Sequence, residues 1–256
     1  MKYIILSYLK FLKSATNQHG VHSPFVYTLV TKCFYDRKKL DAYEKLKEYR
    51  KSLQSNNTII SVTDYGAGSR VFKSNERKVS DIAKHAGAIS KRTKLLARCI
   101  RYFNPSSVLE LGTSVGLGTA ALASVPTVKV TSLEGCPATA AVARKQLSEF
   151  GYSNVDVVVG RFRESAINLL PASYDVVYFD GNHSKKATLE YVELLMPTVH
   201  NETVWIFDDI HWSPEMTEAW EEIKAMESVT VTIDCFWLGF VFFRKEQAKE
   251  HFKIRL

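Results

Sequence analysis

From residue 105 onward, two patterns of hydrophobic residues alternate along the chain. Short apolar or β-branched runs alternate with longer stretches of helical spacing, and proline, glycine or serine often stands at the boundaries. The short runs predict strands at Val108–Leu111, Val128–Leu133, Val155–Val159, Tyr174–Phe179, Thr203–Phe207, Val229–Cys235 and Leu238–Phe243. The longer stretches predict helices at Leu117–Ala123, Ala138–Phe150, Phe162–Leu170, Ser184–Met196 and Ser213–Met226.

This alternation predicts an α/β fold. Five strands each followed by a helix form a parallel sheet with helices on both faces, and the last two runs form an antiparallel hairpin. Ser213 with Pro214 predicts a capped helix start, and Gly151 a helix end. Ligands of such sheets bind beyond the carboxyl ends of the strands. The polar residues expected there are Glu110, Glu134, Asp180, Asp208 and Asp209.

Residues 1–104 have a different pattern, which predicts a mostly helical cap on a domain spanning 105–256. The expected helices are Lys2–Lys13, Pro24–Tyr35, Asp41–Gln54, Val79–Ala86 and Lys91–Phe103, interrupted by an extended piece at Thr58–Asp64. The chain has no internal repeat and no low-complexity linker between these parts. We therefore expect them to pack as one unit.

The charge is unevenly distributed along the 256 residues, whose net charge is +7. Residues 1–100 hold 20 Lys and Arg against 7 Asp and Glu, whereas the rest hold 14 against 20. The favoured interpretation is a solvated basic surface that docks on the acidic remainder. The alternative is a surface that attracts an anionic substrate, a nucleic acid or a membrane. No block of basic residues exceeds three and no nucleic-acid motif accompanies them, so nucleic acid is disfavoured.

Several classes of protein are disfavoured by composition. The four cysteines are scattered without CxxC spacing, which speaks against a disulfide scaffold or a structural zinc site and predicts a cytoplasmic location. No apolar run approaches the length of a membrane span. Lys10 and Lys13 interrupt the first apolar stretch, so a secretory signal is not expected either.

A glycine-rich turn, ELGTSVGLGT at residues 110–119, lies between a predicted strand and a predicted helix. Its spacing is GxxxGxG, not the GxGxxG of dinucleotide-binding folds. Glu134 stands 22 residues after Gly112, at the end of the next strand, where a carboxylate can accept hydrogen bonds from ribose hydroxyls. Glu110 would repel a pyrophosphate but suits an ammonium group. These features favour S-adenosylmethionine over NAD, and tight packing is the alternative explanation of the glycines.

A second glycine motif, DYGAG at residues 64–68, follows the extended segment Ile59–Val62. The residues after it do not form a good apolar helix, and no acidic strand end follows at the proper distance. We therefore predict a turn or hairpin that covers the site, not a cofactor loop.

Four segments resemble the successive motifs of class I S-adenosylmethionine-dependent methyltransferases, in particular the small-molecule O-methyltransferase-like groups. They are ELGTSVGLGTAALA, TSLEGCP, DVVYFDGNH and WIFDDIHW. Further stretches, including HGVHSPFVY, RKVSDIAK and TVTIDCFWLGFVFFRK, are similar to a methyltransferase family common in Bacteroidetes-type bacteria. The resemblance implies a bacterial enzyme with a Rossmann-like, seven-stranded sheet of order 3-2-1-4-5-7-6 whose last strand is antiparallel.

The same resemblance assigns cofactor contacts residue by residue. Gly112, Thr113 and Ser114 would lie beside the methionine moiety, Glu134 would hold the ribose, and Gly160 with Arg161 would border the adenine. The other residues assigned to the cofactor site are Glu110, Gly118, Gly135 and Asp180.

The carboxylates Asp180, Asp208 and Asp209 resemble the ligands of metal-dependent O-methyltransferases. Carboxylate oxygens favour Mg²⁺ or another hard divalent cation, which would lower the pKa of a substrate hydroxyl. The alternative is that Asp180 orders a loop, Asp208 caps a segment and no metal binds. Asp180 is also a candidate catalytic residue, and His183 and His211 are the candidate general bases.

The predicted function is S-adenosylmethionine-dependent O-methylation of a small molecule, with help from a divalent cation as an option. The sequence DGNH stands where amino-methylating enzymes carry an NPPY-like motif, which favours oxygen as the acceptor atom. The main alternative is a non-catalytic cofactor-binding or interaction protein of the same fold. An NAD-dependent oxidoreductase and a membrane-surface role for Lys2–Lys13 are less favoured. A homodimer is the assembly to test.

Overall fold

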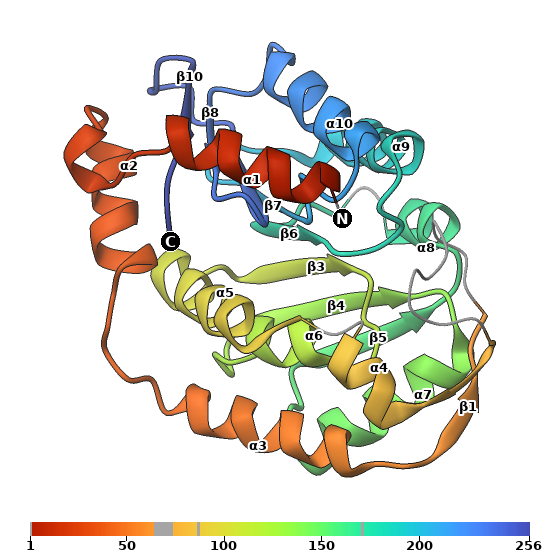
Figure 1. The fold of residues 1–256 in the computed structure, drawn as a ribbon. Coiled ribbons are helices and arrows are strands. Elements are labelled where there is room, and N and C mark those ends of the chain that lie inside the picture. Colours follow the sequence, from red (N-terminus) through yellow and green to blue (C-terminus); the bar gives the residue numbers. More distant parts are fainter. Residues whose placement is uncertain (1, 64–73, 86–87, 170–171) are drawn as a thin grey trace. The chain divides into compact units, whose positions relative to one another are not determined.

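The computed structural model in Figure 1 describes residues 2–63, 74–85, 88–169 and 172–256. The chain forms two compact units, one of residues 1–35 with 170–256 and the other of residues 36–169. We call them the terminal unit and the central unit. The DYGAG motif at residues 64–68 lies outside the described residues, so the structure says nothing about it.

The central unit contains three parallel strands that confirm the first three strand predictions. They are β3 (Ser107–Leu111), β4 (Lys129–Glu134) and β5 (Val155–Val159), with β4 in the middle. The helices that follow them are α6 (Leu117–Leu122), α7 (Pro137–Glu149) and α8 (Phe162–Leu169). Every residue of α6 is buried, as its small apolar composition predicts. Gly151 has φ +66° just after α7, which confirms the predicted helix end.

Three helices and a hairpin complete the central unit. The helices are α3 (Ala42–Ser55), α4 (Val79–His85) and α5 (Ser90–Phe103), and both α3 and α5 pack against α6. Strands β1 (Ile59–Ser61) and β2 (Glu76–Lys78) pair in antiparallel fashion as a hairpin, whereas the turn predicted at residues 64–68 to cover the site lies outside the described residues. The backbone N–H of Thr63 donates to Cys136 Sγ at 3.3 Å. The hairpin therefore lies against the start of α7, two residues beyond Glu134.

The terminal unit holds the other five strands, β6 (Val176–Phe179), β7 (Val204–Asp208), β8 (Val231–Asp234), β9 (Leu238–Phe242) and β10 (Glu250–Lys253). Their order is β6-β7-β9-β8-β10, with β6 parallel to β7 and β9 antiparallel to both of its neighbours. The predicted antiparallel strand is confirmed. The count of seven is wrong, because the described residues contain an eighth strand of the main sheet, β10, which pairs in parallel with β8.

The helices of the terminal unit are α1 (Lys2–Ser14), α2 (Pro24–Leu29), α9 (Lys185–Leu195) and α10 (Pro214–Ala225). Short 3₁₀ segments lie at η1 (Gln18–Gly20) and η3 (Met196–Thr198), and the helix predicted over Pro24–Tyr35 continues beyond α2 as a π-helical turn, η2 (Val30–Phe34). Ser213 Oγ accepts from Met216 N at 3.1 Å, which confirms the predicted cap of α10. None of the helices in the described ranges is long and apolar enough to span a membrane.

Aromatic side chains fill the core of the terminal unit. Phe179 on β6 and Phe207 on β7 stack with ring centroids 4.2 Å apart, and Trp205 meets Phe179 edge-on at 5.4 Å. Trp205 and Trp220 are almost completely buried. The aromatic side chains of β6 and β7 therefore pack closely together, and the polar residues Asp180 and Asp209 follow directly after these two strands.

Candidate functional site

The glycine-rich turn wraps over the end of β4. The backbone N–H groups of Gly112 and Thr113 both donate to the carbonyl oxygen of Leu133, at 3.0 and 3.1 Å. Ser114 has φ +49° and Gly116 φ +82°, so the chain reverses in left-handed backbone conformations before α6 begins. A non-glycine residue in this region is strained, and such strain is concentrated at ligand-binding turns. The turn thus brings the chain from the end of β3 into the start of α6 in a strained, tightly bonded conformation.

Glu134 reaches into this turn, as its position at the end of β4 predicts. Its Oε2 accepts from Ser114 N at 2.7 Å and its Oε1 accepts from Cys136 N at 2.9 Å. These two hydrogen bonds hold the carboxylate in a defined orientation beside the turn. Gly160 N donates to the Glu134 carbonyl oxygen at 3.0 Å, which brings the end of β5 to the same place. The structure therefore brings together Gly112, Ser114, Glu134 and Gly160.

Glu110 lies beneath the turn and is completely buried. It stands opposite Ser132 in the β3–β4 register, and its Oε2 accepts from Ser132 Oγ and from Thr119 Oγ1, the latter at 2.5 Å. Burial raises the pKa of Glu110 to about 7, although these two hydrogen bonds lower it. Its Oε1 has no hydrogen-bond partner in the described part of the chain. A cationic group at the turn would stabilise the ionised form of this carboxyl.

The remaining cofactor candidates of the central unit differ in accessibility. Gly135 and Gly160 are half-buried and Arg161 is exposed, whereas Gly118 is buried inside α6. Thr113 is buried as well, with its Oγ1 2.5 Å from Ser132 Oγ. Because both are buried, Thr113 and Gly118 stabilise the conformation of the turn by packing beneath it.

Tyr49 on α3 supports the turn from below and was not singled out by the sequence. Its hydroxyl donates to the Val115 carbonyl oxygen at 3.0 Å, and its side chain is fully buried. A Cβ atom on Gly116 would come within 2.4 Å of that hydroxyl. The buried spacing of Leu46, Tyr49 and Leu53 marks one face of α3, but no pattern identifies the turn as its partner.

Replacing Tyr49 by phenylalanine should lower the free energy of unfolding by about 1–3 kcal/mol, because the buried Val115 carbonyl loses its donor. Tyr152→Phe is the matched control, since the buried Tyr152 hydroxyl has no hydrogen-bond partner among the described residues. That variant should be neutral or slightly more stable. Denaturant unfolding of both variants checks this, and equal losses would argue against a supporting role for Tyr49.

Asp180 and His183 follow β6 in the terminal unit. The Nε2 atom of His183 lies 3.8 Å from Asp180 Oδ1, which is an electrostatic contact and not a hydrogen bond. Both side chains are partly exposed, at 26% for His183 and 20% for Asp180. His183 thus has a carboxylate nearby and access to solvent.

The predicted metal group of Asp180, Asp208 and Asp209 is not formed. Within the described ranges, no three His, Cys, Asp or Glu side chains are placed to hold a metal ion. Asp208 is still part of β7 and is buried, with Oδ2 accepting from Tyr178 Oη at 3.1 Å and Oδ1 from Asp209 N at 2.9 Å. Asp208 is therefore the last residue of the strand, and its carboxylate is used inside the unit. Only at Asp209 does the backbone turn, with φ +54°.

His211 is engaged on both sides of its ring. Its Nε2 lies 2.9 Å from Asp234 Oδ2, its Nδ1 lies 3.2 Å from Thr217 Oγ1, and the ring stacks on Phe236 at 5.1 Å. With both nitrogens occupied in a nearly buried position, His211 joins the end of β7 to β8 and α10. This geometry favours a structural role over the predicted role as general base.

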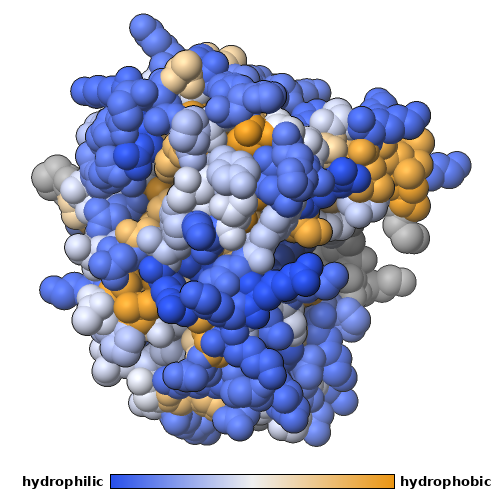
Figure 2. All heavy atoms as spheres, turned by 90° about the vertical axis from the view of Figure 1, so that its left-hand side faces the viewer, coloured by the Kyte–Doolittle hydropathy of each residue, from blue (hydrophilic) through white to orange (hydrophobic). Residues whose placement is uncertain are grey.

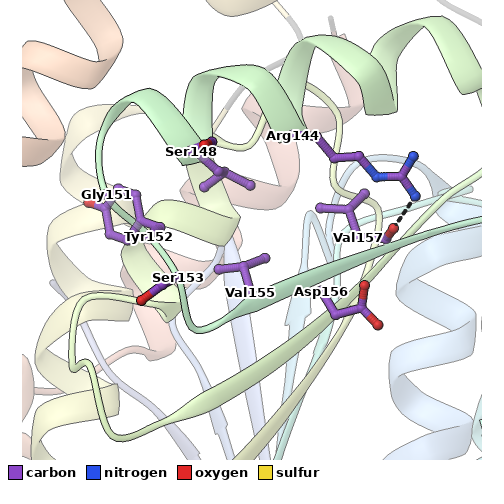
Figure 3. A pocket seen from close by; sticks show the side chains of 9 residues that line it. Arg144, Ser148, Gly151, Tyr152, Ser153, Val155, Asp156 and Val157 are labelled. Atoms are coloured by element: carbon purple, nitrogen blue, oxygen red, sulfur yellow. Dashed lines mark hydrogen bonds between the residues drawn. The ribbon is translucent and has the colours of Figure 1, made fainter.

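A hollow of about 310 Å³ lies elsewhere on the central unit, where α7 ends and β5 begins (Figure 3). Arg144, Tyr152 and Asp156 are among its lining residues, and Arg144 donates to the Val157 carbonyl oxygen. It contains none of the predicted site residues. It stands at the opposite end of β5 from Gly160.

Comparison with known sequences gives one family match. The model of a family described as a methyltransferase domain matches residues 109–210, a span that includes the glycine-rich turn, Glu134 and Asp180. No curated protein sequence matches the chain.

Comparison with solved structures shows the fold. The O-methyltransferase TomG from Streptomyces achromogenes, solved with S-adenosylmethionine, is similar with a TM-score of 0.58 and 16% identity over 90% of this chain and 99% of that one. An O-methyltransferase from Bacillus cereus in complex with S-adenosylhomocysteine gives 0.54 and 16% over 85% and 96%. The S-adenosylhomocysteine-bound Podospora anserina methyltransferase PaMTH1 gives 0.59 and 12% over 88% and 97%. The chain therefore has the α/β fold of these methyltransferases, with its mainly parallel sheet and flanking helices.

Proposed function

We propose that this chain is an S-adenosylmethionine-dependent methyltransferase that methylates a hydroxyl oxygen of a small molecule. The observation that carries the proposal is the position of Glu134, whose carboxylate is fixed by Ser114 N and Cys136 N beside the glycine-rich turn. A carboxylate held at the end of β4 is a suitable acceptor for the hydroxyls of a ribose. The family match over residues 109–210 supports this assignment.

The charges around the turn favour a sulfonium cofactor over a dinucleotide. Glu110 and Glu134 place two carboxyl groups at the turn, and both would repel a pyrophosphate. An amino acid moiety carrying an ammonium group would instead be attracted to these carboxyl groups. Its positive charge would also stabilise Oε1 of Glu110, which has no hydrogen-bond partner among the described residues. Under this proposal Gly112, Ser114, Gly135 and Gly160 border the cofactor with their backbone, and Arg161 lies near its adenine.

The bound cofactor would supply a methyl group already activated by the positive sulfur. The protein then has to orient the acceptor oxygen, exclude water and remove the hydroxyl proton. His183 is the proposed base that accepts the hydroxyl proton, and Asp180 Oδ1 lies 3.8 Å from its Nε2 atom. No step is assigned to a divalent cation, because the described carboxylates do not form a group that fits one.

Replacing His183 by glutamine should lower kcat for methyl transfer by about 100-fold, the usual contribution of a general base, with little change in cofactor affinity. His200→Gln is the matched control, since the His200 Nε2 atom also lies near a carboxylate, 3.2 Å from Asp175 Oδ1, at the start of the same strand. Transfer of labelled methyl groups to a panel of phenols and catechols provides the measurement. Equal rates for the two variants would remove His183 from the mechanism.

The alternative is a non-catalytic protein that binds the same cofactor. The engagement of His211 and the absence of a metal group among the described carboxylates favour it, because both remove candidate catalytic machinery. Cofactor binding without turnover over the whole acceptor panel would support this alternative. Turnover of any acceptor would exclude it.

A further inference from the structure

Helix α1 carries an apolar face that the described residues of the chain leave exposed. Five of the ten large hydrophobic side chains exposed in the described part of the chain belong to this helix, namely Ile5, Leu6, Tyr8, Leu9 and Leu12. In Figure 2 hydrophobic side chains gather at the right-hand margin, at the level of α1, and hydrophilic residues border them. Scattered exposed hydrophobics are normal, but a contiguous group on one helix indicates a binding surface.

The exposed face is distinct from the face that anchors α1. Ile4, Ser7 and Phe11 form the inner stripe, and Phe11 is buried with its ring 5.6 Å from that of Phe236. Tyr3 Oη donates to Thr217 Oγ1 at 2.7 Å and ties the helix to α10. The outer stripe of Ile5, Leu9 and Leu12 repeats at i, i+4 and i+7. Tyr8 lies at the border of the two faces, with its ring 4.8 Å from that of Phe236. Anchoring on one side thus leaves an ordered apolar stripe on the other.

Lysines flank the outer stripe. At about 100° per residue, Lys2, Lys10 and Lys13 project on one side of it, around Leu6. Residues 1–35 contain four lysines and no aspartate or glutamate. On the neighbouring helix α10, Glu218 and Glu222 share Lys185 at 3.1 and 2.6 Å, which offsets one of their two negative charges.

We propose that α1 docks the protein in the plane of an anionic phospholipid surface. The apolar stripe would enter the boundary between headgroups and acyl chains, and the lysines would contact the phosphate groups. Charge complementarity favours this occupant over a second copy of the chain. A two-fold contact through α1 would place the same lysines against each other without an opposing carboxylate in residues 1–35. The proposal does not depend on the cofactor site.

Flotation of the full chain with vesicles of phosphatidylcholine, with and without phosphatidylglycerol, tests this. We expect binding only with phosphatidylglycerol, weakened by added salt and by about five-fold for each lysine removed in Lys10→Gln and Lys13→Gln. The double variant Ile5→Gln with Leu9→Gln should bind at least about tenfold more weakly. Its matched control is Ile59→Gln with Ile89→Gln, since these side chains are 57% and 50% exposed against 58% and 51% on α1.

Unchanged melting temperatures would show that both double variants fold, as expected for side chains that are mostly exposed. Failure of the wild type to bind phosphatidylglycerol vesicles at low salt would overturn the proposal, as would equal binding by the α1 variant and its control. Sedimentation analysis of the wild type and the α1 double variant tests whether this face instead forms a dimer. A wild-type dimer that the α1 double variant converts to monomer would assign this face to a second copy instead.

Discussion

Replacing Glu134 by alanine should weaken the binding of S-adenosylhomocysteine by at least about 100-fold, because two hydrogen bonds from the ribose to a charged acceptor are lost. The substitution also removes the hydrogen bonds that Ser114 N and Cys136 N donate to this carboxylate, at 2.7 and 2.9 Å in the wild type. Glu134→Gln should be nearly as damaging, since its amide group would place an NH₂ against one of those backbone donors. Calorimetric titration measures both effects.

Asp156→Ala is the control for this titration. Asp156 lies on the neighbouring strand β5 but lines the hollow at the other end, away from the turn. Its removal should leave the affinity unchanged. A loss of affinity with Asp156→Ala and none with Glu134→Ala would move the ligand to that hollow and refute the proposed site.

The stability of the cofactor-free protein should fall as the pH rises from about 4.5 to 7, with Glu110 as the cause. The pKa of this buried carboxyl is about 7 against an ordinary 4.5, so between these values the folded state binds more protons than the unfolded state. Its contribution to the free energy of unfolding is therefore largest below pH 4.5 and is lost as the pH rises through the folded pKa. The loss is on the order of 3 kcal/mol.

Glu110→Gln should remove that part of the pH dependence and make the cofactor-free protein more stable at pH 8. In the wild type, a ligand with an ammonium group binds best when Glu110 is ionised. Its affinity should therefore fall on the order of 20-fold between pH 7.5 and 5.5. In Glu110→Gln the affinity should be weak and nearly independent of pH. Thermal unfolding and titration over this range check both statements, and identical pH profiles for the two proteins would contradict them.

Local pattern was enough to predict most of the fold and the position of Glu134 beside the glycine-rich turn. The strand and helix alternation from residue 105 onward is strongly periodic, and the 22-residue spacing placed Glu134 at the end of the strand beside the turn. Strand β10 was missed because only Phe252 of its four residues is buried, so its sequence carries no strand pattern. Its position depends instead on backbone pairing with β8.

Contacts between distant residues could not be predicted in the same way. Tyr49 meets Val115 across 66 residues, and nothing in the helical pattern of α3 identifies that partner. The aspartates at 208 and 209 resembled metal ligands, but Asp208 is the last residue of β7 and its carboxylate accepts hydrogen bonds from Tyr178 Oη and Asp209 N. For α1, the sequence shows that the helix is rich in apolar residues, and only the structure shows which of them Phe236 and Thr217 leave exposed.

A crystal structure of the protein grown with S-adenosylhomocysteine tests the central assignment most directly. We expect the ribose hydroxyls at the Glu134 carboxylate and the amino acid moiety at the turn formed by Gly112 and Ser114, near Glu110. A ligand bound away from Glu134, or a turn that stays closed by its own side chains at saturating ligand, would contradict the assignment and leave only the fold.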